Sequence, residues 1–313
     1  MKNKKNIPKK DNSRLSIRTL GKLFKTAFLG WWNKDPFRQS AVIAYYAIFS
    51  IPGLLFLIIA FTGNIFGKEA VIHNIITQVN VTMGSDTGSQ IENMLAKIAQ
   101  PHLTAIGSII GLVVLFFGAT GVFVELQKTL NIIWEVKVVP KSGIISFLKS
   151  RIFSFGLILA IAFLLLISLV ISAALAAMSD WIQAYSSGFT IIIFNTLNII
   201  FSFAFISVLF ALMFKFMPDA KIKWKHVWIG SIVAGALFTL GKTALAFYFG
   251  KAQPASVYGV AGSIILIMLW VSYSSMIVFF GAELTATYAK LFTAKVLPTN
   301  IAVATNSEGE NKK

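Results

Sequence analysis

Residues 190–217 read TIIIFNTLNIIFSFAFISVLFALMFKFM, and Lys215 is the only charged residue among them. In soluble domains about one residue in four is charged. About 20 consecutive apolar residues are enough for an α-helix to cross the hydrocarbon core of a bilayer, which is about 30 Å thick. The length and apolarity of this stretch therefore predict a membrane-spanning helix.

Similar apolar stretches recur along the 313-residue chain, which is 56% hydrophobic and only 13% charged. With so few charges, the chain has too little polar surface to cover a water-facing globule of this size. We predict an all-α fold, a polytopic membrane bundle of six transmembrane helices. The spans are expected at about 37–61, 103–123, 153–178, 190–217, 227–249 and 258–280.

The basic residues alternate between the two sides of this predicted bundle. The net charge is +16, from 28 basic and 12 acidic residues. Twenty-four of the basic residues lie in the N-terminal 40 residues, in two connections and in the C-terminal tail, whereas the other three connections hold three. Cytoplasmic loops carry the excess of Lys and Arg. The alternation predicts that both termini are cytoplasmic, and it explains the charge without a nucleic-acid partner.

The segment before the first span has two parts. Residues 1–16 are polar and basic, and we expect a disordered tail there. Residues 17–34 place apolar and aromatic side chains at helical spacing, with Arg18, Lys22 and Lys25 off that stripe. This pattern predicts an amphipathic helix. The helix either lies in the cytoplasmic membrane interface or packs on its own bundle.

The remaining boundaries follow from the spans. Asp35 and Pro36 are typical of a helix start, so the six-helix transmembrane domain is placed at 35–290. It includes a polar outer segment at 63–102. Residues 291–313 are expected to be a flexible cytoplasmic tail.

Four motifs occur in order along the chain: AYYAIFSIP at 44–52, GVFVELQ at 121–127, MPDAKIKW at 217–224 and YGVAGS at 258–263. Together they resemble the YihY/virulence factor BrkB family of bacterial inner-membrane proteins, over about 35–290. The resemblance implies a multi-pass protein of the bacterial cytoplasmic membrane, with membrane lipids as its partners. Members of that family have been connected with serum resistance, with export of lipids or lipopolysaccharide precursors, and with cation/proton exchange.

The family was formerly mislabelled ribonuclease BN, and the sequence offers nothing for nuclease chemistry. Its three histidines, His73, His102 and His226, are scattered over both sides of the predicted membrane. Asp, Glu and His do not occur at metal-ligand spacing, and there is no nucleotide-binding loop. We therefore expect no enzymatic activity, no catalytic residues, no cofactor and no metal.

Polar groups inside the spans are candidates for a substrate or ion path, because burying them in a bilayer is costly. Lys242 lies in the predicted fifth span. It either pairs with a carboxylate or an anionic substrate group, or it extends its ammonium to the outer headgroups. Asn198 in the fourth span either lines a path or holds helices together.

A second set of candidates lies at the cytoplasmic ends of the spans. Glu125 and Glu283 end the second and sixth spans, Gln127 and Asn131 follow on the helix that carries Glu125, and Asp219 follows a proline in an inner loop. These five residues either form a polar cytoplasmic mouth that handles a proton, a cation or a headgroup, or they cap helices and pair with the inner basic residues.

Glycine and proline mark two candidate hinges. Pro52 and Gly53 should kink or weaken the first span near its middle. Gly259 and Gly262 lie at the start of the sixth span, where they provide either close helix contact or a flexible segment.

Two functions fit these features. The first is a transporter or flippase-like protein for lipids or small solutes, which a proton or cation gradient could drive. The alternative is a non-transporting scaffold or assembly partner in the cell envelope. The sequence is compatible with a homo-oligomer but does not indicate one.

Overall fold

The fold is described from a computed structural model. It describes residues 17–83, 88–89, 91–93, 95, 105–138, 188–252, 260–292, 298–299 and 302–304. The predicted tail at 1–16, the predicted span at 153–178 and the predicted hinge residue Gly259 lie outside the described residues.

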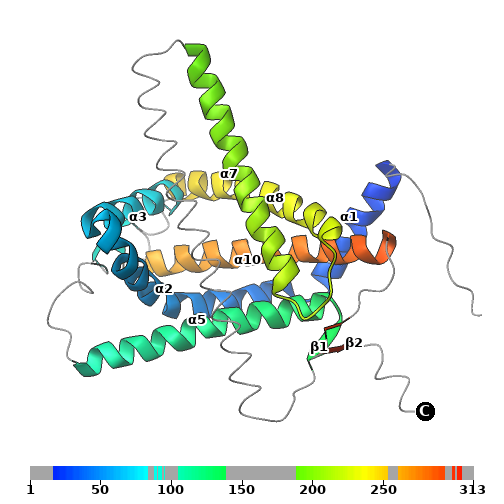
Figure 1. Ribbon diagram of the computed structural model, residues 1–313, viewed down its shortest axis with the longest axis horizontal. Helices are drawn as coiled ribbons and strands as arrows, with labels where there is room; N and C mark the ends of the chain where they lie inside the picture. Colours follow the sequence, from blue (N-terminus) through cyan, green and yellow to red (C-terminus); the bar gives the residue numbers. More distant parts are fainter. Residues whose placement is uncertain are drawn as a thin grey trace, which may run out of the picture.

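The described residues are mainly helical, with a small two-stranded sheet at one end (Figure 1). The elements in chain order are α1 (Ile17–Trp32), α2 (Pro36–Phe66), α3 (Lys68–Met83), α5 (Ala105–Ile133), β1 (Val136–Val138), α7 (Gly188–Phe216), α8 (Trp224–Ala252), α10 (Val260–Phe292) and β2 (Ala302–Ala304). Five of the six predicted spans overlap one of these helices.

Three helices among the described residues are long and apolar enough to cross a membrane. Their apolar windows are Ile199–Phe216 in α7, Trp224–Leu245 in α8 and Ile264–Phe292 in α10. These windows support the prediction of a helical membrane protein. The count of six spans and their orientation stay predictions.

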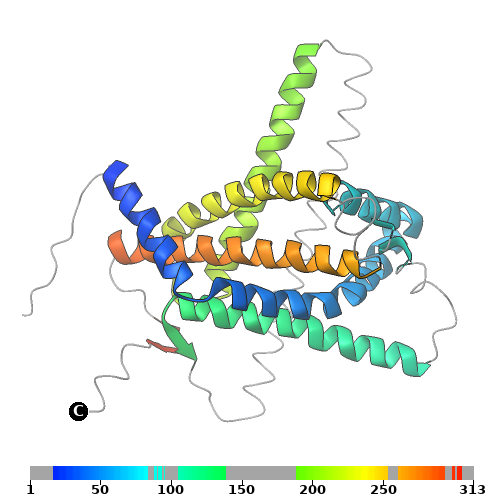
Figure 2. The same ribbon diagram turned by 180° about the vertical axis from the view of Figure 1, so that it is seen from behind.

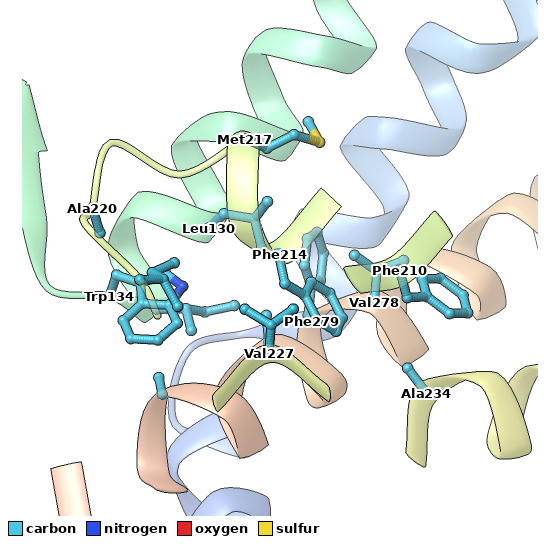
Figure 3. Close-up of a cluster of buried hydrophobic side chains, with 14 of the residues drawn as sticks. Leu130, Trp134, Phe210, Phe214, Met217, Ala220, Val227, Ala234, Val278 and Phe279 are labelled. Carbon is cyan, nitrogen blue, oxygen red and sulfur yellow. The ribbon is translucent and has the colours of Figure 1, made fainter. Parts of the chain in front are cut away.

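The helices α2, α5, α8 and α10 run side by side, with α10 between α2 and α8 (Figures 1 and 2). α5 packs on α2, α7 packs on α8, and α1 crosses one end of α10. At that end, buried side chains from four helices meet in one core: Leu130 of α5, Phe214 of α7, Val227 of α8 and Phe279 of α10 (Figure 3). The core thus fixes the end of the bundle where α1 and the sheet lie.

Glycines allow two of these helix pairs to approach closely. A Cβ on Gly118 of α5 would lie 2.9 Å from the backbone nitrogen of Ser50 in α2. A Cβ on Gly281 of α10 would lie 3.0 Å from the carbonyl oxygen of Gly230 in α8. Small residues at such contacts let helix backbones pack against each other.

α1 packs on the bundle through one face. Leu23 and Ala27 are buried and form a small cluster with Leu284 of α10. The other face carries large exposed apolar side chains, namely Leu20, Phe24, Phe28, Leu29 and Trp32. Packing on the bundle is therefore observed, while the position of the exposed face in a membrane interface stays a prediction.

The two-stranded sheet was not predicted from the sequence. β1 and β2 pair in antiparallel register, with Val136 opposite Ala304 and Val138 opposite Ala302. The C-terminal segment was expected to be flexible from residue 291. In the structure α10 continues to Phe292, and β2 pairs with the strand that follows α5; the flexibility of residues 291–313 stays a prediction. Backbone hydrogen bonding to a neighbouring valine-containing strand thus holds part of this segment against the bundle.

Candidate functional site

A buried ion pair lies where the link between α1 and α2 meets α10. Lys34 Nζ is 2.6 Å from Oε2 of Glu283, and the Glu283 side chain is only 5% exposed, compared with 22% for Lys34. A buried carboxylate is costly unless it is paired and hydrogen-bonded. Lys34 therefore makes this carboxylate tolerable inside the packed end of the bundle.

The turn between α1 and α2 holds the backbone of Lys34. Asp35 adopts the left-handed conformation, with φ 50° and ψ 57°, and Pro36 begins α2. Asp35 occupies the predicted cap position but makes no side-chain cap hydrogen bond. Gln39 instead donates from Nε2 to the carbonyl oxygen of Lys34 at 2.6 Å. The first turn of α2 thus holds the backbone of Lys34, whose side chain pairs with Glu283 of α10.

Gly30 of α1 makes room for the Glu283 side chain. A Cβ at this position would overlap the Glu283 carboxylate, with Cδ only 3.1 Å away. A residue larger than glycine would have to displace the carboxylate. The close approach of α1 to α10 at this point therefore depends on the absence of a side chain.

A small pocket lies beside the ion pair, between α1, α2, α5 and α10. It is lined by Trp31, Lys34, Pro36, Gln39, Thr129, Ile133 and Phe279. Three buried polar atoms of these residues make no hydrogen bond within the part of the chain that the structure describes: Trp31 Nε1, Gln39 Oε1 and Thr129 Oγ1. Buried polar groups are hydrogen-bonded in the great majority of cases. The space beside these three atoms has the size of about one water molecule, and it lies next to a lysine.

A second polar cluster joins α5 to the connection between α7 and α8. Asn131 Nδ2 donates to Asp219 Oδ2 at 2.8 Å, and the Asp219 backbone N–H donates to Asn131 Oδ1, also at 2.8 Å. Gln127 adds a longer bond of 3.3 Å to the same carboxylate oxygen. The Thr299 N–H donates to the Asp219 carbonyl at 3.0 Å. The structure therefore brings together three of the predicted mouth residues in one hydrogen-bonded cluster, in which the Thr299 hydroxyl is buried without a described partner.

The two glutamates of the predicted mouth have different partners. Glu283 pairs with Lys34, whereas Glu125 lies 3.4 Å from Lys128 one turn along α5. Lys242 is partly buried on α8 and makes no hydrogen bond or ion pair with any other described residue. Neither the anionic partner nor the headgroup contact predicted for Lys242 is tested by these contacts.

The remaining candidates occupy helices. Asn198 lies on α7, and α2 continues as a single helix through Pro52 and Gly53. α2 bends toward α3 along its length (Figures 1 and 2). Gly262 is buried in the first turn of α10. A hinge motion at these positions stays a prediction.

Sequence reasoning did not single out Lys34, Gln39, Thr129 or Trp31 as site residues. The sequence does indicate that Glu283 needs a nearby cation, because acidic residues are scarce among the spans and an unpaired one there is costly. The predicted cytoplasmic side holds many basic residues, so the sequence does not show which of them pairs with Glu283. Only the crossing of α1 over α10 identifies Lys34.

Fold and site together define a helical membrane protein with a buried ion pair at one end of its bundle. The chain belongs to the Virulence factor BrkB family, whose model matches residues 27–301. This match confirms the family resemblance of the four motifs.

Relatives named "UPF0761 membrane protein" support the membrane assignment. The chain is 25% identical over 275 residues to the one from Saccharophagus degradans, covering 87% of this chain and 60% of the relative. It is 27% identical over 180 residues to the one from Verminephrobacter eiseniae, covering 56% and 40%. The matched part thus spans 40% to 60% of the length of these relatives. No solved structure matches the chain significantly.

Proposed function

We propose that this protein is a transporter or flippase-like protein for lipids or small solutes in the bacterial cytoplasmic membrane, driven by a proton or cation gradient. The observation that carries the proposal is the buried pair between Lys34 and Glu283. The pair connects two parts of the fold that are 249 residues apart in sequence. Membrane lipids are the only partners that the proposal requires, and it includes no catalytic step.

A buried ion pair is a weak way to stabilise a fold, because both ions lose their hydration. Well-packed apolar side chains of similar volume are often as stable or more so. What an ion pair offers is reversibility. A proton or cation that neutralises Glu283 removes the attraction that holds Lys34, and with it one contact between the α1–α2 link and α10. A transporter requires such a link between ion occupancy and the contact of its moving elements.

The experiment is an ion-flux measurement on the purified full chain in proteoliposomes. A trapped pH-sensitive dye reports proton movement, and quenching of a fluorescent phospholipid reports lipid transfer. We expect Glu283→Gln to abolish gradient-driven movement. Glu135→Gln is the matched control, because it also removes a carboxylate paired with a lysine of α10, here Lys290 at 2.7 Å, but at an exposed position outside the candidate site. Full activity of a folded Glu283→Gln protein would contradict the proposal.

We also propose six spans with both termini in the cytoplasm. The end of the bundle with α1 and the sheet would be the inner end, and α3 would lie outside (Figure 2). The chain contains no cysteine, so single-cysteine variants report topology directly. In intact cells, a membrane-impermeant maleimide should label His73→Cys on α3 and spare Lys221→Cys between α7 and α8, both of which are exposed positions. The reverse labelling pattern would invert the proposed orientation.

A further inference from the structure

We propose that α1 is a docking surface for anionic phospholipids in one leaflet of the membrane. The inference goes beyond the proposed function, because it concerns the lipids that hold this helix and not the substance that the protein moves. It rests on the faces of α1, which differ in their contacts and in their chemistry. The occupant that these faces fit is a lipid surface with negatively charged headgroups, such as one that contains phosphatidylglycerol.

The face of α1 that packs on the bundle is narrow. Leu23 and Ala27 are buried against Leu284 of α10, and Ile229 and Val233 of α8 pack on the same cluster. Because an α-helix has about 3.6 residues per turn, positions four apart stay on one side of it. Most other positions of α1 are exposed. The helix thus lies on the outside of the bundle, across the end of α10 (Figure 2).

An apolar stripe runs along α1, about a quarter turn from this bundle face. Its members follow one another at intervals of four residues and are all exposed: Leu20, Phe24, Phe28 and Trp32. The stripe continues beyond the helix, because the Trp32 ring lies 5.7 Å from the ring of Phe37 in the first turn of α2. Exposed aromatic side chains on such a stripe are typical of insertion at the boundary between headgroups and acyl chains.

The stripe also adjoins a helix that is long and apolar enough to cross a membrane. Trp31, beside the stripe, packs edge-on against Phe280 of α10, with ring centroids 6.0 Å apart. Phe280 lies inside the apolar window Ile264–Phe292 of α10. The stripe therefore extends the apolar surface of a candidate span, and both meet the same lipid.

The basic face of α1 lies roughly opposite the bundle face. It consists of Arg18, Lys22 and Lys25, all of which are exposed. None of them forms an ion pair with another described residue, and α1 itself contains no acidic residue. The charges of this face are thus complementary to anionic headgroups beside the helix.

A polar face lies between the basic face and the bundle face. It carries Thr26 on α1 and Asn33 just after the helix, both exposed. The order around the helix is therefore bundle, apolar stripe, basic face and polar face. A helix lying beside a bundle in the membrane interface meets protein, acyl chains, headgroups and water in that order. Lipids without net charge would cover the apolar stripe but would leave the basic face without counter-charges, so the basic face favours anionic lipids.

The position of α1 is tested with spin labels on the purified full chain in nanodiscs of phosphatidylcholine and phosphatidylglycerol. The chain has no cysteine, so single-cysteine variants can be labelled at chosen positions. Phe28→Cys places the label on the apolar stripe, and Thr26→Cys places it on the polar face of the same helix. We expect oxygen, which concentrates among acyl chains, to reach the first label, and a water-soluble nickel complex to reach the second. Equal access of both reagents to both labels would overturn the inference.

The preference for anionic lipid is tested by fluorescence quenching of a bimane attached to the Phe28→Cys variant. The bilayers contain equal amounts of phosphatidylcholine and phosphatidylglycerol, with bromine on the acyl chains of one lipid or the other. We expect brominated phosphatidylglycerol to quench more strongly, because anionic lipid gathers at α1. Adding Lys22→Gln should lower this enrichment by up to about fivefold, which corresponds to about 1 kcal/mol for one basic residue at an anionic surface.

Lys22→Arg in the same labelled protein is the matched control. It changes the same exposed position but keeps the charge, so the enrichment should stay. High salt should lower the enrichment in both proteins, since it screens exposed charges. Equal quenching by the two brominated lipids, or the same enrichment with Lys22→Gln as with Lys22→Arg, would overturn the inference.

The lipid surface and the proposed function can fail separately, because neither measurement on α1 follows the movement of a solute or proton. If the two lipids quench equally but Glu283→Gln still abolishes flux, the lipid surface is wrong and the proposed function stands. If anionic lipid gathers at α1 but Glu283→Gln leaves flux unchanged, the lipid surface stands and the proposed function is wrong.

Discussion

Two polar clusters lie at the same end of the bundle and hold a carboxylate in different ways, partly buried at Asp219 and buried at Glu283. Asp219 is held by amide donors and a backbone bond, in a reciprocal pair with Asn131. Glu283 is held by the charge of Lys34, beside a pocket whose buried polar atoms lack partners among the described residues. In the first cluster the side chains around Asp219 bond to one another and one hydroxyl, that of Thr299, lacks a described partner, whereas three buried polar atoms beside the second lack one.

This difference separates a structural cluster from a functional one. A buried network with every bond satisfied makes one arrangement rigid. A buried network with unused donors raises the energy of the empty state and favours any ligand that satisfies them. We therefore expect variants of the Asp219 cluster to alter stability, and variants of the Glu283 cluster to alter transport even where stability is kept.

The largest expected effect comes from removing one member of the Lys34–Glu283 pair. Glu283→Met leaves a lysine without its partner and should lower the free energy of unfolding by about 3 kcal/mol, less than for a fully buried pair because Lys34 is partly exposed. The double variant Lys34→Met with Glu283→Met should regain most of this stability and still lack flux. Urea denaturation in micelles and proteoliposome flux measure the two quantities. A double variant as unstable as the single one would show that the pair is mainly structural.

The Asp219 cluster should behave in the opposite way. Asn131→Ala removes both bonds of the reciprocal pair and should cost about 2 kcal/mol, because the partly buried carboxylate of Asp219 loses its shortest hydrogen bond. Gln127→Ala removes the longer bond to the same oxygen and should cost less. Flux per folded molecule should stay at the wild-type level in both variants. A loss of flux in Asn131→Ala at full folding would assign this cluster to the transport path as well.

The sequence predicts the helices of this fold well, because long apolar stretches bounded by charges leave few alternatives. Residues 190–217 were predicted as a span, and α7 covers Gly188–Phe216. The sequence predicts the small strand β2 poorly. A three-residue strand has too short a pattern to recognise, and its formation depends on a partner more than 160 residues away in sequence.

The site was predicted in part, for a related reason. Glu283, Asn131 and Asp219 stand out because polar residues are rare near spans. Their partners do not follow from spacing along one helix. Whether Glu283 pairs with Lys34 or lies beside Glu125 depends on how α1, α5 and α10 cross, and this is a property of tertiary packing. Sequence patterns therefore identify the polar residues whose burial is costly, but they do not show which residues these pair with.

The smallest effect tests how α1 reaches α10. Gly30→Ala places a methyl group against the Glu283 carboxylate and should cost about 1 kcal/mol, since the overlap outweighs the better helix propensity of alanine. Because the methyl group also pushes the carboxylate away from Lys34, flux should fall several-fold. Denaturation midpoints and proteoliposome flux measure both effects.

Gly21→Ala is the matched control on the same helix. A Cβ there meets nothing within 4 Å, so only the helix propensity acts, and the change should stabilise the protein by up to about 1 kcal/mol with unchanged flux. If Gly30→Ala lowers the free energy of unfolding and Gly21→Ala raises it, then α1 is sensitive to substitution at its contact with Glu283 and not along its whole length. If Gly30→Ala stabilises the protein as Gly21→Ala does and leaves flux intact, then the close fit of Glu283 against α1 does not set the geometry of the ion pair. The contrast between the two clusters would then rest on the pocket alone.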